Sequence, residues 1–329
     1  MNVPVEGRDV AVIIVNYNSG AYLAACLAAL ARQTVPPGRI LVVDNASSDD
    51  SLTRGLAGRT QVESEQMGYN AGFAVANNRG LALCRDYPWV ALLNPDAFAE
   101  PRWLEEMLAV AGPGIGAVAC RMRQADDARV LDGTGDVYHV SGLAWRRQYG
   151  NPVASPEPTR QPVFAPCAAA ALYRHAAVIE ADGFDEDYFC YFEDVDLGFR
   201  LRLLGYACAY TPAAVVRHVG SGIAGRDSDF TIYHGHRNLV WTFVKNMPGR
   251  LFWLYLPQHL LLNLVSLVYF AFKGRGATLL KAKWHALGGL GAAWRKRAVI
   301  QRSRRIDVGV VRTHMLSGWL APYRGRHVG

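Results

Sequence analysis

One carboxylate follows directly after a run of apolar residues of strand length. Asp96 lies in Leu92-Leu93-Asn94-Pro95-Asp96-Ala97, with the neutral Asn94 two positions before it. A hard cation that bridges a diphosphate needs oxygen ligands on rigid backbone, and the protein usually supplies only one or two of them. Asp96 could be such a ligand, with Asn94 as its companion. The alternative is that Asn-Pro-Asp is simply a turn that caps the next helix.

A second acidic group is embedded in aromatic residues. Glu193, Asp194 and Asp196 fall within four positions, next to Tyr188, Phe189, Tyr191 and Phe192. An aromatic wall raises the affinity of a carboxylate for protons and so suits a general base. Aromatic faces also pack against the C–H faces of sugar rings. Because helix N-termini favour acids through the helix dipole, capping is the alternative function of these residues.

The elements that would position these residues alternate between strand and helix. The periodicity predicts buried strands at residues 10–15, 40–43, 89–93 and 115–119, and helices at 19–32, 73–83, 101–110 and 195–204. Strands without polar alternation, separated by helices, are typical of a mostly parallel sheet that is covered on both faces. We therefore expect an α/β fold, with a proline-rich surface loop at 151–166.

Polar clusters follow three of these strands. They are Asn16-Tyr17-Asn18, Asp44-Asn45 and Asn94-Pro95-Asp96. In open α/β sheets, ligands bind beyond the carboxyl ends of the strands, so the three clusters predict a common site. His218 follows a further strand-like run; a lone histidine is more often a satisfied core residue than a ligand.

Composition and charge restrict the class of protein. The 329 residues are 51% hydrophobic and 19% charged, which is enough for a sizeable core. The six cysteines form no C-x-x-C pair, which disfavours a zinc site or a disulfide framework, and the N-terminal residues do not resemble a signal peptide. From Lys273 onward there are 13 Lys and Arg against one Asp, so this tail has a formal charge of +12. Because the net charge of the whole chain is +7, the residues before the tail carry −5. Such a tail suggests an anionic partner.

Read together, the motifs resemble family-2 glycosyltransferases of the bacterial rhamnosyltransferase-like branch, over roughly residues 9–247. The residues that carry the resemblance are Val15-Asn16-Tyr17-Asn18, Val42-Val43-Asp44-Asn45-Ala46-Ser47-Ser48-Asp49, Gly68-Tyr69-Asn70-Ala71-Gly72-Phe73, Asn77-Asn78-Arg79-Gly80, Leu93-Asn94-Pro95-Asp96, Gly183-Phe184-Asp185-Glu186, Tyr191-Phe192-Glu193-Asp194-Val195-Asp196-Leu197, His218-Val219-Gly220-Ser221 and Arg237-Asn238. Each motif alone is weak, and their joint order and spacing are specific.

The resemblance implies a GT-A type fold and a single-displacement transfer that inverts the anomeric carbon of a nucleotide sugar, with dTDP-rhamnose as the favoured donor. By analogy, the nucleotide-sugar site contains the turn Asn16, Tyr17, Asn18 together with Asp44, Asn70 and Asn94. A nucleoside diphosphate is then the leaving group. The acceptor implied is a hydroxyl of a lipid-linked saccharide or a cell-surface polysaccharide.

The same resemblance assigns the catalytic groups. Asp96 stands where the last acid of the family's D-x-D motif binds Mg²⁺ or Mn²⁺, and His218 completes that metal site. Asp194 stands at the catalytic base, with Glu193 and Asp196 as flanking support. This chain departs from the strict motif because Asn94 replaces the first acid.

An apolar segment separates this region from the basic tail. Residues 251–272 contain no formally charged side chain and are long enough to span a bilayer, which needs about 20 residues. Because both flanks are basic, we favour an interfacial helix or hairpin on the cytoplasmic leaflet over a spanning one. The division expected is a catalytic domain at 1–248 and a membrane-associating helical region at 249–329. Anionic lipid would contact Lys281, Lys283, Arg295, Lys296, Arg297, Arg302, Arg304 and Arg305.

Three other functions compete with this one. A nucleic-acid-binding protein would use the basic tail, but it leaves the acids at the strand ends unexplained. A nucleotidyltransferase also uses nucleotides and metal, and it would release pyrophosphate rather than a nucleoside diphosphate. A catalytically inactive scaffold is disfavoured by the presence of Asp96, Asp194 and His218.

Overall fold

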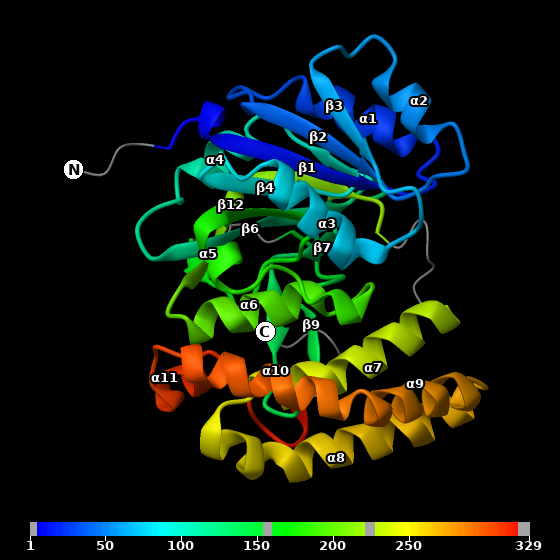
Figure 1. The fold of residues 1–329 in the computed structure, drawn as a ribbon, viewed down its shortest axis with the longest axis vertical. Helices are drawn as coiled ribbons and strands as arrows, with labels where there is room; N and C mark the ends of the chain where they lie inside the picture. The colour runs from blue at the N-terminus through cyan, green and yellow to red at the C-terminus, as the bar shows by residue number, and fades with distance from the viewer. Residues whose placement is uncertain (1–4, 154–159, 221–227, 322–329) are drawn as a thin grey trace.

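The computed structural model describes residues 5–153, 160–220 and 228–321. Figure 1 shows a twisted sheet with helices on both faces, and below it a layer of helices formed by the C-terminal part of the chain. The strands are β1 (Val10–Asn16), β2 (Arg39–Asp44), β3 (Val62–Gln66), β4 (Trp89–Leu93), β5 (Ala97–Ala99), β6 (Ile115–Gln124), β7 (Leu131–Gly133), β8 (Asp136–Tyr138), β9 (Ala144–Arg146), β10 (Gln161–Pro162), β11 (Ala170–Arg174) and β12 (Ala207–His218).

The α-helices are α1 (Tyr22–Leu30), α2 (Ser51–Leu56), α3 (Gly72–Leu83), α4 (Trp103–Leu108), α5 (His175–Glu180), α6 (Glu193–Leu203), α7 (Asp229–Asn246), α8 (Gly249–Phe272), α9 (Gly276–Gly288), α10 (Leu290–Ser303) and α11 (Val308–Thr313). Two short 3-10 helices, η1 (Gly7–Asp9) and η2 (Glu186–Tyr188), precede β1 and α6. The strands and helices predicted from periodicity are all present, with ends shifted by a few residues.

The large sheet has the strand order β10-β12-β6-β11-β4-β1-β2-β3. Strands β12, β6, β4, β1, β2 and β3 run in one direction, while β11 pairs antiparallel with β4 and β6, and β10 pairs antiparallel with β12. The expected mostly parallel sheet is therefore present, with β11 inserted against the common direction. The direction of β11 could not be predicted from the sequence, because its apolar residues pack equally well in either direction.

Alternation along β1 creates the two cores of the sheet. Val10, Val12 and Ile14 face a core shared with α1 and α4, while Ala11 and Ile13 face a core shared with α3, α5 and α6. A strand buried on both faces gives the continuous apolar run seen in the sequence. With both faces covered, the carboxyl ends of the strands are left open for polar groups.

Several elements were not predicted, among them β3 and α7. Strand β3 reads VESEQ, because it is the edge strand and its side chains are largely exposed. Helix α7 lacks a simple apolar stripe, since one part of it buries polar residues such as Asn238 and Asn246. The predicted surface loop at 151–166 lies partly outside the described residues. Its last residues contradict that prediction, because they form β10 and then enter the core at Phe164 and Ala165.

The C-terminal helices share a core with the helices that cover the sheet. The predicted boundary at 248/249 falls at the turn between α7 and α8, but Leu251 and Phe252 pack into the same cluster as Phe199 of α6 and Phe243 of α7. In addition, His139 forms a β-bridge with Leu316 near the end of the described chain. The helical region is thus a layer of one structure, and removing it would expose that core.

Five of the eight cations that were expected to contact lipid have partners within the protein. Lys296 pairs with Asp185 and Asp187, and Arg305 pairs with Glu180. Backbone carbonyl groups accept hydrogen bonds from Lys283, Arg297 and Arg304. Lys281, Arg295 and Arg302 remain exposed. The nucleic-acid alternative loses much of its basis, because it relied on the free charge of this tail.

Candidate active site

The carboxyl ends of β1 and β4 and the start of α6 enclose a cavity of about 710 Å³. Most of the residues predicted for the site line it, namely Tyr17, Asn70, Asn94, Asp96, Glu193, Asp194 and His218. Asn16, Asn18, Asp44 and Asp196 are not part of its wall. The cavity therefore joins the two acidic motifs, which are almost 100 residues apart in sequence.

Asn16 organises the turn after β2 from beneath the surface. Its side chain is fully buried, and its amide nitrogen donates to Asp44 Oδ1 at 2.8 Å, Ser47 Oγ at 3.0 Å and Ser51 Oγ at 2.9 Å. Asn18, with a φ of 46°, accepts a hydrogen bond from the Ser48 amide at 2.7 Å. Asn16 therefore holds Asp44 and the turn after β2 in place, and a ligand would contact the rim of this network rather than Asn16.

Asn70 lines the cavity and is held there by a hydrogen bond from Asn45. Asn45 Nδ2 donates to Asn70 Oδ1 at 2.9 Å, and Asn45 Oδ1 accepts from the Ala71 amide at 2.9 Å. Asn70 Oδ1 also accepts from the Gly72 amide at 3.1 Å, at the start of α3. These contacts fasten the residues before α3 to the end of β2, so one wall of the cavity is rigid.

Asp96 and His218 meet at the other end of the cavity. His218 lies at the end of β12, with Nε2 3.4 Å from Asp96 Oδ1, and both side chains are buried. Its Nδ1 donates to Asp132 Oδ2 at 2.7 Å, while Nε2 has no hydrogen-bond partner among the described residues. Burial lowers the pKa of His218, but the hydrogen bond to Asp132 and the proximity of Asp96 raise it overall.

This pair fits a divalent cation. A ligating histidine typically donates its second ring nitrogen to a carboxylate, which fixes the ring and leaves the other nitrogen for the metal. Here Asp132 takes that role and Nε2 is the orphaned buried atom beside Asp96. The described residues contain no cluster of three or more His, Cys, Asp or Glu that could hold a metal. Two protein ligands suit a cation whose other ligands are phosphate oxygens and water.

Asp194 sits in the wall of the cavity at the first turn of α6. Its Oδ2 accepts from the Ala168 amide at 3.0 Å and its Oδ1 from the Val195 amide at 2.8 Å. Burial raises the pKa of Asp194, although these amides and the charge of Arg146 oppose the rise. A fixed carboxylate with an increased affinity for protons has the character of a general base.

The two neighbouring acids differ from each other. Glu193 lines the cavity, and burial and the charge of Asp194 raise its pKa well above the ordinary value. Asp196 points away from the cavity and is bound by Arg200, Lys245 and Asn246. Although burial favours its protonated form, Arg200 and Lys245 hold the pKa of Asp196 well below the usual range. Asp196 therefore anchors α6 and does not flank the base within the cavity.

The segment before α6 has an unusual backbone. Phe189, Tyr191 and Phe192 have φ angles of 64°, 68° and 69°, a region that residues other than glycine rarely adopt. Asn238 of α7 stabilises this segment, because its buried amide donates to the carbonyl oxygens of Tyr188, Cys190 and Tyr191 at 3.1, 2.9 and 2.7 Å. Arg237 donates to the carbonyl groups of Asp187 and Tyr188 at 3.0 and 2.9 Å. The Arg237-Asn238 motif is thus a backbone clamp.

The segment 188–192 also contacts a second helix, α3, on its other side. The Phe189 carbonyl accepts from the Phe73 amide at 2.6 Å, at the start of α3. Gly72, at a φ of 83°, allows this approach, since a Cβ there would lie 2.5 Å from Phe189 Cδ2. The segment 188–192 is held between α3 and α7, and it fixes the start of α6, where Asp194 lies.

Sequence reasoning missed the opposite wall, which the β8–β9 hairpin forms. Asp136, Trp145 and Arg146 line the cavity, and Arg146 forms an ion pair with Asp132. The segment Asp132-Gly133-Thr134-Gly135-Asp136, with two carboxylates around two glycines, is the signal that could have revealed it. A β-hairpin with such short strands gives no periodicity to detect.

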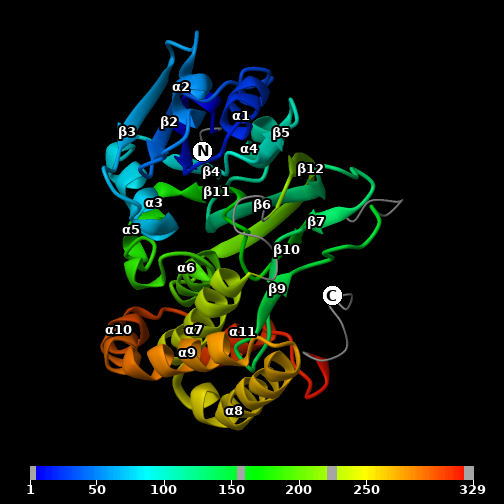
Figure 2. The same ribbon diagram turned by 90° about the vertical axis from the view of Figure 1, so that its right-hand side faces the viewer.

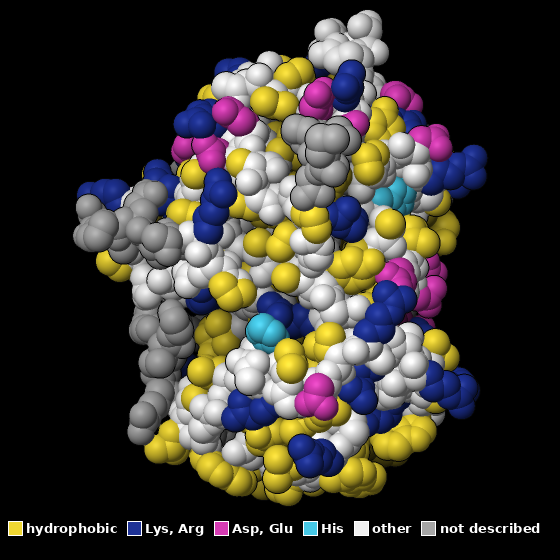
Figure 3. All heavy atoms as spheres, turned by 90° about the vertical axis from the view of Figure 1, so that its left-hand side faces the viewer, with side chains coloured by type: hydrophobic (Ala, Val, Ile, Leu, Met, Phe, Trp, Pro, Cys, Tyr) yellow, Lys and Arg dark blue, Asp and Glu magenta, His cyan; other side chains and the backbone are white. Residues whose placement is uncertain are grey.

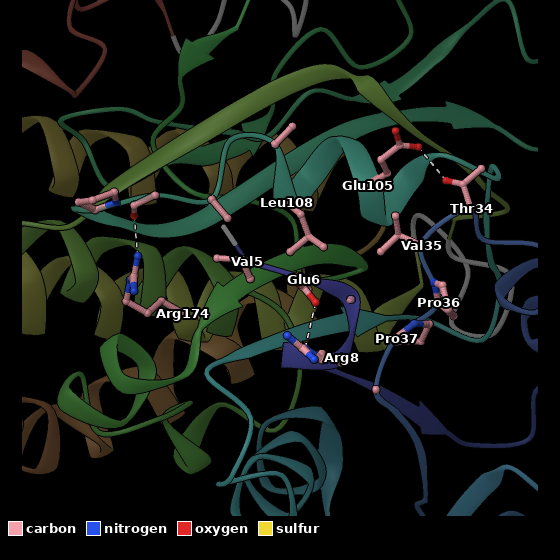
Figure 4. A pocket seen from close by; sticks show the side chains of 16 residues that line it. Val5, Glu6, Arg8, Thr34, Val35, Pro36, Pro37, Glu105, Leu108 and Arg174 are labelled. Atoms are coloured by element: carbon pink, nitrogen blue, oxygen red, sulfur yellow. Dashed lines mark hydrogen bonds and ion pairs between the residues drawn. The ribbon is translucent and has the colours of Figure 1, made fainter. Parts of the chain in front are cut away.

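A larger hollow of about 1060 Å³ lies at the amino ends of the strands, shown in Figure 4. Its charged groups are already paired, as Arg8 with Glu6 at 2.9 Å and Glu105 with Thr34 at 2.8 Å. Because ligands of α/β sheets bind at the carboxyl ends of strands, we place the active site in the smaller cavity.

Comparisons with known proteins agree with this geometry. The family model described as "Glycosyl transferase family 2" matches residues 11–180. The chain is 32% identical over 241 residues to the N-acetylglucosaminyl-diphospho-decaprenol L-rhamnosyltransferase of Mycobacterium tuberculosis, which covers 66% of this chain and 78% of that relative.

Two solved structures resemble the fold. The mannosyltransferase PcManGT from Pyrobaculum calidifontis, in complex with GDP-Man and Mn²⁺, matches with a TM-score of 0.53 and 18% identity, over 93% of this chain and 86% of that one. GalNAc-T7 with UDP, GalNAc and Mn²⁺ matches with a TM-score of 0.57 and 14% identity, over 72% of this chain and 47% of that one. Both likenesses confirm the predicted GT-A type fold. With the family model matching more than half of the chain, this protein belongs to glycosyl transferase family 2 and is a glycosyltransferase.

Proposed function

We propose that this glycosyltransferase moves a sugar, with rhamnose from dTDP-rhamnose as the first candidate, to a hydroxyl of a lipid-linked acceptor with inversion. The observation that carries the proposal is that Asp194 and the Asp96–His218 pair open into one cavity at the carboxyl ends of the strands. The name of the mycobacterial relative, which specifies a diphospho-decaprenol and rhamnose, supports the choice of sugar and acceptor. Small changes in a pocket can reverse a preference between related sugars, so the donor is tested with a panel.

Asp194 is the group that moves a proton. Its carboxylate takes the proton of the acceptor hydroxyl as the oxygen attacks the anomeric carbon from the face opposite the leaving group. The Ala168 and Val195 amides hold this carboxylate toward the cavity. Asp96 and His218 would hold Mg²⁺ or Mn²⁺, whose chemistry is to neutralise negative charge on a nucleoside diphosphate. The Mn²⁺ in both structural neighbours supports that choice of ion.

A direct test combines a nucleotide-sugar panel with a short-chain lipid-diphosphate N-acetylglucosamine acceptor. We expect release of a nucleoside diphosphate together with a product of inverted anomeric configuration, read by NMR. Release of pyrophosphate would instead favour the nucleotidyltransferase alternative. A product with retained configuration would exclude Asp194 as the base of a single displacement.

Asp96→Ala should weaken metal-dependent binding of the nucleotide, by roughly tenfold or more, because one of two protein ligands is lost. Titration of dTDP with and without Mn²⁺ measures this directly. Asp86→Ala, at an exposed turn, is the control and should bind as the wild type does. Wild-type binding and transfer that are insensitive to EDTA would count against the metal site.

The helical layer presents an apolar face that suits a membrane surface. Helix α8 is the one helix in the described chain that is long and apolar enough to cross a bilayer, yet it lies along the outside of the protein (Figure 1). Figure 3 shows hydrophobic side chains gathered at this end, with Lys and Arg among them. The exposed apolar residues of α8, α9 and α10 are Trp253, Leu254, Leu260, Leu261, Leu264, Val265, Val268, Tyr269, Phe272, Leu280, Trp284, Leu287, Trp294 and Val299.

The packing of α8 favours attachment in the plane of the membrane over spanning. Midway along the helix, His259 is buried. Its Nδ1 donates to the Ser141 carbonyl oxygen at 2.8 Å, and its ring stacks on Phe243 at a centroid distance of 4.0 Å. Since the acceptor of Nδ1 is a carbonyl oxygen, Nδ1 carries the hydrogen. A spanning α8 would have to abandon these contacts. We therefore propose monotopic attachment at the cytoplasmic face of the membrane.

Leu264→Glu with Val268→Glu should reduce sedimentation with vesicles containing phosphatidylglycerol, because two carboxylates on one helical face oppose burial in the interface. Leu264 is 58% exposed and Val268 is 50% exposed, so the fold should tolerate the change. Ile179→Glu, at an exposed apolar residue of α5, is the matched control. Equal sedimentation of all three proteins would place the attachment elsewhere.

A further inference from the structure

The wall formed by the β8–β9 hairpin contains a buried carboxylate that has no role in the chemistry described above. Asp136 is 5% exposed and lines the cavity. Its backbone is fixed by the pairing of β8 with β9 and by a hydrogen bond from its amide to the Ala165 carbonyl at 2.8 Å. No hydrogen-bond donor to its carboxylate is found in the parts of the chain that the structure describes. Because buried polar groups normally have partners, this one points to a ligand.

We propose that Asp136, Trp145 and Arg146 form the subsite for the acceptor sugar, in which the Asp136 carboxylate accepts a hydrogen bond from a sugar hydroxyl. This inference rests on the proposed function, because it names the residues that receive the lipid-linked acceptor. Carboxylates accept strong hydrogen bonds from hydroxyl groups, and an aromatic ring offers a face for the C–H groups of a sugar.

The electrostatics of the wall agree with a polar, uncharged ligand group at this point. Asp136, Asp194 and Glu193 all line one cavity, and burial and the charge of Asp194 raise the pKa of Asp136 well above its ordinary value. A sugar hydroxyl can bond to this carboxyl group in either protonation state, because a hydroxyl both donates and accepts hydrogen bonds. Arg146 lies directly opposite Asp136 in the β8–β9 pair and forms an ion pair with Asp132, which in turn holds His218. One hairpin thus connects this subsite to the Asp96–His218 end.

The other end of the hairpin reaches the helical layer. Figure 2 shows the strands running down from the sheet toward α8 and α11. The chain after β8 bonds to α8 through the Ser141 carbonyl and His259 Nδ1, at 2.8 Å, and His139 bridges to Leu316. From Asp136 to Ser141 the chain can extend at most about 17 Å, at 3.3–3.4 Å per residue. An acceptor whose lipid lies at the apolar face of α8 therefore has a short path along this hairpin to Asp194.

The test compares kinetics for a short-chain lipid-diphosphate N-acetylglucosamine acceptor with the affinity for dTDP. Asp136→Asn should raise the KM for the acceptor roughly 10- to 100-fold, as loss of a hydrogen bond to a charged group does, while the Kd for dTDP stays within twofold. Asp132→Asn is the matched comparison and should show the opposite pattern, with weakened metal-dependent dTDP binding. Thermal unfolding of each variant checks that the fold is kept.

A second pair of variants covers the case in which Asp136→Asn does not fold. Trp145→Ala should raise the acceptor KM, and Trp145→Phe should restore it in part, because only the aromatic face is required. The inference is overturned if wild-type transfer is measurable and both Asp136→Asn and Trp145→Ala leave the acceptor KM unchanged. It is also overturned if Asp136→Asn weakens dTDP binding as much as acceptor binding. If the wild-type enzyme transfers sugar to no lipid-linked acceptor, the result refutes the proposed function itself, and this inference with it.

Discussion

Asp194→Asn is expected to abolish transfer, with a loss of roughly 10²- to 10⁴-fold in kcat, while nucleotide binding stays close to normal. The amide keeps the size of the carboxyl group and its place beside the Ala168 and Val195 amides, but it cannot take a proton from the acceptor hydroxyl. Single-turnover transfer and a dTDP titration on the same protein separate the two effects. Near-normal turnover would refute the assignment of Asp194 as the base.

Glu193→Gln is the informative comparison, because Glu193 lines the same cavity and its pKa is also raised. If Asp194 is the base, this variant should retain much more activity than Asp194→Asn. The reverse order would move the base to Glu193. The pH dependence follows the same logic: a base works only when deprotonated, so kcat of the wild type should fall as the pH decreases through the raised pKa of Asp194.

The sequence was sufficient to predict the sheet and the two ends of the site, since both depend on local signals. Buried parallel strands leave apolar runs, and the residues after them, such as Asp44 and Asp96, are the ones that meet at the carboxyl edge. The acidic segment 193–196 was noticed because acids and aromatics are adjacent in the chain, and the family resemblance singled out Asp194 within it. The structure then places Asp96, His218 and Asp194 around one cavity.

What the sequence could not show depends on contacts between distant residues. Asn16 and Asp196 have the residue types of a binding site, but full burial and their partners make them supports of the fold. Asp136 was missed for the converse reason, because its importance comes only from facing Asp194 across the cavity. The partners of the tail charges could not be predicted either, because Lys296 pairs with two acids more than 100 residues earlier in the chain.

The clamp on residues 188–192 leads to the second large effect, in Asn238→Asp. The change is almost isosteric, but it replaces the amide that donates to three carbonyl oxygens with a carboxylate that repels them. Without the clamp, the positive φ angles at Phe189, Tyr191 and Phe192 have little to maintain them, and each costs about 1–3 kcal/mol. The start of α6 should then shift, and a shift of about 1 Å at a catalytic group can lower the rate about 10²-fold.

A loss of stability alone would not explain such a result, and Asn246→Ala tests that point. Asn246 is equally buried on α7, but its amide donates to Asp196 of α6 rather than to the segment 188–192. Leaving a buried partner unsatisfied should cost about 1–3 kcal/mol of unfolding free energy in either variant. At a temperature where both proteins are folded, only Asn238→Asp should also lower kcat. The decrease of its kcat at low pH should also shift to a different pH, because the burial of Asp194 changes. A kcat of Asn238→Asp equal to that of the wild type would reduce the clamp to a role in stability, and would mean that α6 alone positions the base.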